Sequence, residues 1–378
     1  MPWLALFLIL WLSACGPAPA EPETATSRRL SLAETLGAEE DAAYARALAP
    51  RPFVFPDDHG PHPAFKTEWW YFTGNLEDEA GRRFGYQLTF FRIALAPAPV
   101  ERPSAWGATQ IFMGHFALSD LDGRRFFAEE RFSRAALSLA GAQAVPFRVW
   151  LEDWEASGPA GMFPLRLRAA GAEVALDLSL DAGKPLVLQG EAGLSRKSAA
   201  EGNASYYYSF TRLPTSGQVR IGAQSFTVRG VSWLDREWST SALAPDQQGW
   251  DWFALQFDDG RELMFYQLRL KDGGRDAASK GILVEADGQS RLLRGEEVDL
   301  EVLEHWRSPR GGSYPSRWRL RIAEEDLELI VVPALADQEL DVSIRYWEGA
   351  VIATGTRGGT PLRGRGYVEL TGYAREEP

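Results

Sequence analysis

The chain has 378 residues, of which 45% are apolar and 24% are charged, and its formal net charge is −12. A chain of this length usually forms two domains, and this composition is typical of a globular rather than a disordered protein. The negative charge would repel phosphate backbones, so we expect no nucleic-acid partner.

The N-terminus carries an apolar run at residues 3–12, followed by Leu-Ser-Ala-Cys ending at Cys15. The run is too short to span a bilayer and has the length of a signal-peptide core. The tetrapeptide is similar to a bacterial lipobox, and Cys15 is the only cysteine of the chain. We predict a lipoprotein signal peptide at 1–15 and lipidation of Cys15. Because no Lys or Arg precedes the run, an uncleaved anchor and a plain secretory signal are the alternatives.

This prediction places the protein in the cell envelope, anchored by lipid on the periplasmic side, and Gly16 after the cysteine favours the outer membrane. Residues 16–51 then combine a tether with a short helix. Pro, Ala, Thr and Glu at 16–30 predict a flexible linker. Helical spacing after Ser31 predicts a helix that ends before Pro50.

From residue 52 the pattern is alternation and turns, which is typical of β-strands. A Trp-rich hairpin occurs twice, first at 68–88 and again at 250–268, and later matches between the copies keep their order. The chain is therefore divided into repeats at 52–245 and 246–378. Closure of antiparallel strands into barrels removes exposed edges. We predict an all-β fold of two tandem lipocalin-like (calycin-type) antiparallel β-barrels, with a pair of sandwiches as the alternative.

The first strand of the hairpin places Glu68 on one face with Trp70 and Phe72, and the second strand places Gln87 on one face with Thr89. If these faces point inward, the first barrel has an aromatic lumen with isolated polar groups, as expected for a site that holds an apolar ligand. Core filling by the aromatic side chains is the alternative.

His115 alternates with Met113 on a strand face opposite several large apolar residues. An imidazole that faced a barrel lumen could act as a general acid or base. A buried histidine held by a neighbour is the alternative. The loop at 57–63 also brings two Asp and two His together. We expect its polar groups to tie it to the barrel mouth rather than to hold a metal ion, which needs about three convergent ligands.

The strongest chemical candidate is Trp-Leu-Asp-Arg-Glu-Trp-Ser at 233–239. Strand alternation puts Asp235 and Glu237 on one face with Trp233, and Arg236 with Trp238 on the other. Partial burial beside a cation can tune the pKa of such a carboxyl group. A structural network of salt bridges is the alternative.

At these residues the chain resembles the family of carotenoid 1,2-hydratases and AttH-like bacterial lipoproteins, over about residues 50–375. The matching segments are 62–63, 67–76, 115–120, 233–238, 250–253, 346–350 and 366–373. The resemblance implies two lipocalin-like barrels. For the hydratase branch it implies addition of water to the terminal double bond of an acyclic carotenoid without a cofactor, after an aspartic acid protonates the alkene.

Asp235 matches that aspartate. Trp233 stands where the hydratases carry Tyr, and Tyr-Tyr-Tyr-Ser at 206–209 stands where assisting His and Trp are expected. These departures place the chain on the AttH-like side of the resemblance.

We therefore expect a membrane-anchored protein that binds an apolar, isoprenoid or lipid-like ligand and hydrates or hydrolyses it by acid catalysis, with no cofactor. The expected catalytic residues are Asp235, Glu237, Glu68 and His115. The expected ligand contacts are Trp70, Phe72, Gln87, Met113, Tyr208, Trp233, Trp238 and Trp252. The alternative is a non-catalytic carrier of apolar ligands beside an ABC transporter permease, which a lipid tether outside the cytoplasm would suit.

Overall fold

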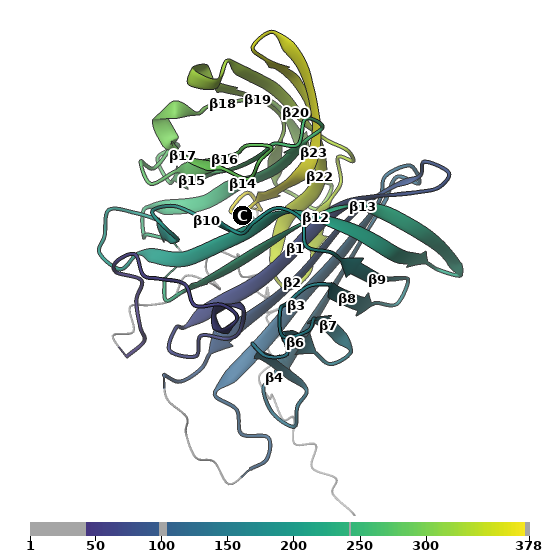
Figure 1. Ribbon diagram of the computed structural model, residues 1–378, viewed down its shortest axis with the longest axis vertical. Coiled ribbons are helices and arrows are strands. Elements are labelled where there is room, and N and C mark those ends of the chain that lie inside the picture. The colour runs from purple at the N-terminus through teal and green to yellow at the C-terminus, as the bar shows by residue number, and fades with distance from the viewer. Residues whose placement is uncertain (1–42, 98–103, 242, 375–378) are drawn as a thin grey trace, which may run out of the picture.

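The computed structural model describes residues 43–97, 104–241 and 243–374. These residues form two antiparallel sheets, each curved into a barrel or half-barrel (Figure 1). The predicted fold of two lipocalin-like barrels is confirmed. The predicted signal peptide, the lipidated Cys15 and the tether at 16–30 lie outside the described residues. So does most of the predicted helix, and its described part, 43–48, is not helical.

The first sheet has the order β4-β3-β2-β1-β13-β12-β9-β8-β7-β6-β5, with β10 and β11 also paired to β12. Its strands are β1 (Thr67–Asp78), β2 (Arg83–Ala94), β3 (Gln110–Asp120), β4 (Arg125–Arg134), β5 (Ala140–Gln143), β6 (Arg148–Leu151), β7 (Trp154–Ser157), β8 (Leu165–Ala170), β9 (Val174–Leu180), β10 (Val187–Leu188), β11 (Leu194–Arg196), β12 (Ala204–Ile221) and β13 (Gln224–Ser239). A short 3₁₀ helix, η1 (Asp57–His59), precedes them.

The second sheet has the order β17-β16-β15-β14-β23-β22-β20-β19-β18, with β21 also paired to β22. Its elements are β14 (Gln247–Phe257), β15 (Glu262–Leu270), β16 (Lys280–Val284), β17 (Ser290–Arg294), η2 (Gly295–Glu297), β18 (Asp299–Arg307), β19 (Ser313–Ile322), η3 (Ala323–Glu325), β20 (Leu327–Pro333), β21 (Glu339–Asp341), β22 (Arg345–Arg357) and β23 (Thr360–Leu370). In both sheets the opening hairpin pairs with the closing strand, β1 with β13 and β14 with β23.

Strands far from the contact between the barrels alternate strictly. In β9 the side chains of Val174, Leu176, Leu178 and Leu180 are buried, while the residues between them are half-buried or exposed. One face of such a strand covers the core and the other meets water. In β2 and β3, by contrast, nearly every residue is buried on either face. The outer face of these strands is covered because the second barrel packs against it (Figure 1).

Each lumen is filled by side chains. Trp70 and Phe72 are fully buried in the core of the first barrel together with Leu88 and Leu234. These aromatics are therefore core filling, which was the alternative to an aromatic lumen that holds a ligand. A separate apolar cluster lies between the barrels and includes Tyr71 and many residues of β14 and β15. Among the described residues, no helical segment has the length and apolar character needed to cross a membrane.

Candidate functional site

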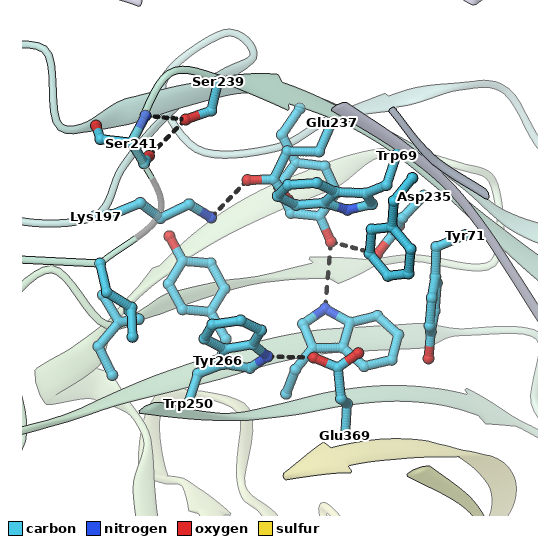
Figure 2. A pocket seen from close by; sticks show the side chains of 15 residues that line it. Trp69, Tyr71, Lys197, Asp235, Glu237, Ser239, Ser241, Trp250, Tyr266 and Glu369 are labelled. Atoms are coloured by element: carbon cyan, nitrogen blue, oxygen red, sulfur yellow. Dashed lines mark hydrogen bonds and ion pairs between the residues drawn. The ribbon is translucent and has the colours of Figure 1, made fainter. Parts of the chain in front are cut away.

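A cavity of about 80 Å³ lies between the two barrels (Figure 2). One buried water needs about 10–15 Å³ on this scale, so the cavity has room for several small groups. Its lining consists of Trp69, Tyr71, Phe91, Lys197, Tyr207, Asp235, Glu237, Ser239, Ser241, Leu243, Trp250, Trp252, Tyr266, Leu268 and Glu369. Aromatic rings dominate this wall, and its few polar groups come from both barrels. Such a wall is typical of a site for a mainly apolar small molecule.

Asp235 is 3% exposed, and it lines the cavity from β13. It accepts hydrogen bonds from Ser209 Oγ at 2.5 Å, from Trp233 Nε1 at 2.6 Å and from the hydroxyl of Tyr207. Burial raises the pKa of Asp235 to about 7, against these hydrogen bonds, which favour the charged form, and the neighbouring Glu237 carboxylate raises it further. Asp235 thus holds a proton in a large share of molecules at neutral pH.

The neighbours of Asp235 also indicate which oxygen carries that proton. The indole of Trp233 can only donate, and it points at Oδ1. A hydroxyl can donate or accept, so Tyr207 can accept from a protonated Oδ2. The hydroxyl of Tyr207 in turn accepts from Trp252 Nε1 at 3.2 Å. The acid proton of Asp235 is therefore expected on Oδ2, beside the cavity.

A charged pair borders the same cavity. Lys197 Nζ lies 2.9 Å from Glu237 Oε1, and Ser205 also donates to Glu237. Burial lowers the pKa of Lys197, but Glu237, Tyr266 and Asp235 together outweigh burial and raise it. The ammonium group also lies 4.5 Å from the ring centre of Tyr266, which adds a cation–π contact. Lys197 and Glu237 thus form an ion pair at the polar end of the cavity.

A second carboxyl group, Glu369 of β23, lies across the cavity from Asp235 (Figure 2). Trp250 Nε1 donates to it. Burial raises the pKa of Glu369 to about 7, although hydrogen bonds from Glu348 and Trp250 favour its charged form. Both barrels thus place a buried carboxyl group with a raised pKa at the same cavity.

Glu68, a predicted catalytic residue, does not line this cavity. It is fully buried at one end of the first barrel, where it pairs with Arg92 and Arg236 and accepts from the backbone nitrogen of His62 at 3.0 Å. Arg236 also stacks over Trp70, with its guanidinium carbon 3.9 Å from the ring centre. Glu68 is thus the centre of a buried ion-pair network that joins β1, β2 and β13.

His115 faces the second barrel rather than the lumen of the first. Its Nδ1 lies 2.8 Å from the hydroxyl of Tyr346, and its Nε2 lies 3.0 Å from Glu130 Oε1. Met113 lies on the same face in an apolar cluster with Tyr346. Gln87 also lies on this outer face, since its register partner Thr73 alternates with the core residue Phe72. The condition under which His115 and Gln87 would reach the lumen is not met, because the bulkier Phe and Leu side chains of β2 and β3 fill it, and His115 is a buried histidine held by its neighbours.

Of the predicted ligand contacts, Trp252 lines the cavity. Trp233 does not line it but orients Asp235 through the hydrogen bond from its Nε1. Tyr208 and Trp238 belong to a different cluster on the opposite face of their strands. Tyr208 lies 2.7 Å from His59 Nδ1, and Trp238 stacks on His62 at 3.7 Å between ring centres. These two aromatic residues fix the N-terminal loop rather than reach the cavity.

The loop at 57–63 is held by its own polar groups. Asp58 pairs with Arg51 at 2.5 Å and with His62 Nε2 at 2.9 Å. Burial and the Arg236 charge lower the pKa of His59 to about 4, so this imidazole is neutral at physiological pH. Within the described part of the chain, no three His, Cys, Asp or Glu side chains gather as a metal ion would require.

The cavity residues that sequence reasoning did not select are mostly aromatic residues on the outer faces of strands, such as Trp69, Tyr71 and Tyr266. Lys197 was missed as well, since it follows a short strand with no motif around it. The Trp-rich repeat contained one usable signal. Trp69 and Tyr71 correspond to Trp250 and Trp252 in the second copy, and all four line the cavity.

A family model described as AttH-like matches residues 46–373. A crystal structure from Nitrosomonas europaea named as an AttH protein is similar to this chain at 37% identity and a TM-score of 0.78, covering 87% of this chain and 100% of that one. Kievitone hydratase from Nectria haematococca is similar at 15% identity and a TM-score of 0.67, with 86% and 94% covered. CghA is similar at 14% identity and a TM-score of 0.53, with 89% and 98% covered. These last two show the shared fold alone. A search of curated proteins gave no match.

Proposed function

The chain belongs to the AttH-like family, and we propose that it binds an apolar, unsaturated ligand of isoprenoid type between its two barrels and adds water to a double bond, with Asp235 as the acid. The observation that carries this proposal is a protonatable carboxyl group buried in an aromatic cavity, with only neutral hydrogen-bond donors in contact with it among the described residues.

Hydration of an alkene begins with proton transfer to carbon, which leaves a carbocation. The acid must therefore be protonated at working pH, and its surroundings must tolerate a transient positive charge. Asp235 meets the first demand because burial raises its pKa to about 7. The rings of Trp69, Tyr71 and Trp252 meet the second, because aromatic faces attract cations. No step in this scheme requires a cofactor.

The size of the cavity fits a reaction at one end of a longer molecule. About 80 Å³ accommodates the end of an alkenyl chain and a water molecule, while the remainder of the ligand would extend out of the cavity. The ion pair of Lys197 and Glu237 offers a polar contact at the rim. The likeness in fold to kievitone hydratase is consistent with hydration. The substrate in that protein's name is not proposed for this chain.

We further propose that lipid on Cys15 holds the protein on the periplasmic side of the envelope, where its ligand would come from a membrane. Labelling of the wild-type protein, but not of the Cys15→Ser variant, with a fatty acid in growing cells would support this anchor. Recovery of both proteins in the soluble fraction would contradict it.

The test of the proposed function is incubation of the purified wild-type protein with detergent-solubilised lycopene or geraniol. We expect a product heavier by one water, and Asp235→Asn should lower the rate by about 10²–10⁴-fold, the usual contribution of a positioned acid. Asp177→Asn is the matched control, because Asp177 is exposed on the outside of β9 and pairs only with surface arginines.

If neither the wild-type protein nor the Asp235→Asn variant turns over these compounds, the hydratase proposal is overturned. If both proteins then still quenched their tryptophan fluorescence on addition of these compounds, the result would favour the alternative, a non-catalytic carrier of apolar ligands that serves an ABC-type permease.

A further inference from the structure

Asp235 and Glu369 occupy the same position in the two repeats. Across β1 and β13, Asp235 is the register partner of Tyr71, and across β14 and β23, Glu369 is the register partner of Trp252. Tyr71 and Trp252 themselves correspond in the duplicated hairpin. The duplication has therefore produced two carboxyl groups that face one cavity from opposite sides, as Figure 2 shows.

The immediate neighbours of the two carboxyl groups differ. Ser209 is the next register partner of Asp235 on β12, whereas Glu348 is the next register partner of Glu369 on β22. Glu348 is fully buried, and its Oε1 accepts from the hydroxyl of Tyr71 at 2.6 Å. Its buried Oε2 has no hydrogen-bond donor among the described residues, and the side chains of Glu348 and Glu369, which are register partners, interact by a hydrogen bond. A proton on Glu348 that is donated to Glu369 would satisfy both groups.

The charges around this pair favour one proton rather than none or two. Burial raises the pKa of Glu348 well above its usual value, and the negative charge of Glu369 raises it further. The titratable groups that act on Glu369 are Glu348, Tyr346, Tyr71 and Glu237, and Asp235 and Lys197 line the same cavity. The positive charge of Lys197 is already paired with Glu237, so the two carboxyl groups cannot both ionise cheaply. Glu348 keeps its proton, and Glu369 is the member that ionises.

We propose, on the basis of the proposed hydration, that Glu369 is the catalytic base that deprotonates the attacking water, and that Glu348 is a positioning residue that holds Glu369 by a hydrogen bond. Asp235 would protonate the alkene from one side of the cavity, and the water would approach from the side of Glu369.

The proposed hydration moves one proton from Asp235 to the alkene and one from water to Glu369. The O–H bond of Asp235 breaks as a C–H bond forms on one alkene carbon, and the alkene electron pair supplies that bond. Water attacks the other carbon, a C–O bond forms, and the water proton passes to the Glu369 carboxylate. The step ends with Asp235 ionised and Glu369 protonated, and exchange with solvent restores both. No oxidant or reductant takes part.

Single substitutions at Glu369 and at Glu348 distinguish a catalytic base from a pair of carboxyl groups that only stabilises the fold. Glu369→Gln removes the base, and we expect the rate of hydration of lycopene or geraniol to fall by about 10²-fold or more. Glu348→Ala removes the group that positions Glu369, so we expect a loss of about tenfold, smaller than that of Glu369→Gln, while Asp177→Asn on the surface should keep the wild-type rate. A merely structural pair would respond equally to both changes, and equal losses would overturn the proposal.

A second readout distinguishes failure of this inference from failure of the proposed function. In D₂O, Asp235 can deuterate the alkene reversibly even when no base captures water, so Glu369→Gln should incorporate deuterium into recovered lycopene or geraniol without forming the hydrated product. Asp235→Asn should do neither. Hydration by Glu369→Gln at the wild-type rate would refute a base role while leaving the acid role of Asp235 intact.

If the wild-type protein turns over neither compound, the proposed function fails, and the shared proton can still be tested. Infrared spectra should then show a protonated-carboxyl band at neutral pH that weakens in Glu348→Gln. An unchanged band would overturn the assignment of the proton to Glu348.

Discussion

Two buried carboxyl groups on the same pair of strands have opposite ionisation. Glu68 and Asp235 lie on the neighbouring strands β1 and β13, and both are almost inaccessible to solvent. Burial alone would raise the pKa of Glu68, but contact with Arg236 and Arg92 holds it well below its usual range. Asp235 has only neutral donors in contact with it, and its pKa rises to about 7. Both carboxyl groups are buried, so the charge of the contacting groups decides whether the carboxyl group is ionised in a salt-bridge network or can keep a proton for catalysis.

The largest expected effect is on stability at the ion-pair network. Glu68→Gln would leave Arg92 and Arg236 buried without their counter-charge, and loss of one partner of such a pair costs about 3–5 kcal/mol. Urea unfolding of the purified protein measures this. Asp235→Asn is the matched variant. At pH 4, where Asp235 is protonated in the folded protein, it should change the free energy of unfolding by less than about 1 kcal/mol, because no opposite charge loses its partner. Equal costs would break the comparison.

Asp235 and Glu68 should also change the free energy of unfolding with pH in opposite directions. Between about pH 4 and pH 7 folded Asp235 binds more protons than its unfolded form, so its contribution to stability falls as pH rises through this window. Asp235→Asn should therefore flatten the curve there by about 3–4 kcal/mol, since the pKa of Asp235 is raised from 3.8 to about 7 and one pKa unit corresponds to about 1.4 kcal/mol.

Glu68 contributes in the opposite sense. Its folded form stays ionised below about pH 4, where the unfolded form binds a proton, so stability is lost as pH falls. Urea unfolding from pH 3 to pH 8 would reveal both slopes. A curve unchanged by Asp235→Asn would show that Asp235 is ionised in the folded protein.

His115 sharpens the comparison because it is buried but does not line the cavity that Asp235 lines. His115→Asn would remove a hydrogen bond to Tyr346 that joins the two barrels and one to Glu130 on the neighbouring strand of the first barrel, and leaving such partners unsatisfied costs about 1–3 kcal/mol. The rate of hydration should be unchanged, because His115 does not line the cavity. A loss of rate with full stability would instead return His115 to the list of catalytic candidates.

The smallest effect concerns the hydrogen bonds that limit the pKa of Asp235. Tyr207→Phe removes a donor that favours the charged form, so the pKa of Asp235 should rise by about one unit or less. Infrared titration of the carboxyl band measures this. Tyr266→Phe is the control, because its hydroxyl contacts Ser195 at 2.8 Å rather than Asp235. A fall in the pKa of Asp235 in Tyr207→Phe would contradict the role of Tyr207.

The repeat, the strand periodicity and the Asp235 segment could all be identified in the sequence, because each depends on local pattern. The acid predicted from 233–239 lines the cavity, and so do its neighbour Glu237 and the predicted contact Trp252. Glu68 and His115 show the limit of that reasoning. Each is a polar residue on an apolar strand, and the sequence contains no local signal that separates an ion pair from a catalytic group.

The amino-acid sequence by itself determined that the chain is all-β and duplicated, and that its closing strands carry the acidic side chains. Only the tertiary structure decided which strand faces meet. β1, β2, β3 and the second half of β13 are buried on both faces because one face fills the first barrel and the other packs on the second, so alternation could not assign inside and outside. The cavity, the partner of each buried charge and the pairing of Asp235 with Glu369 across it arise from that packing.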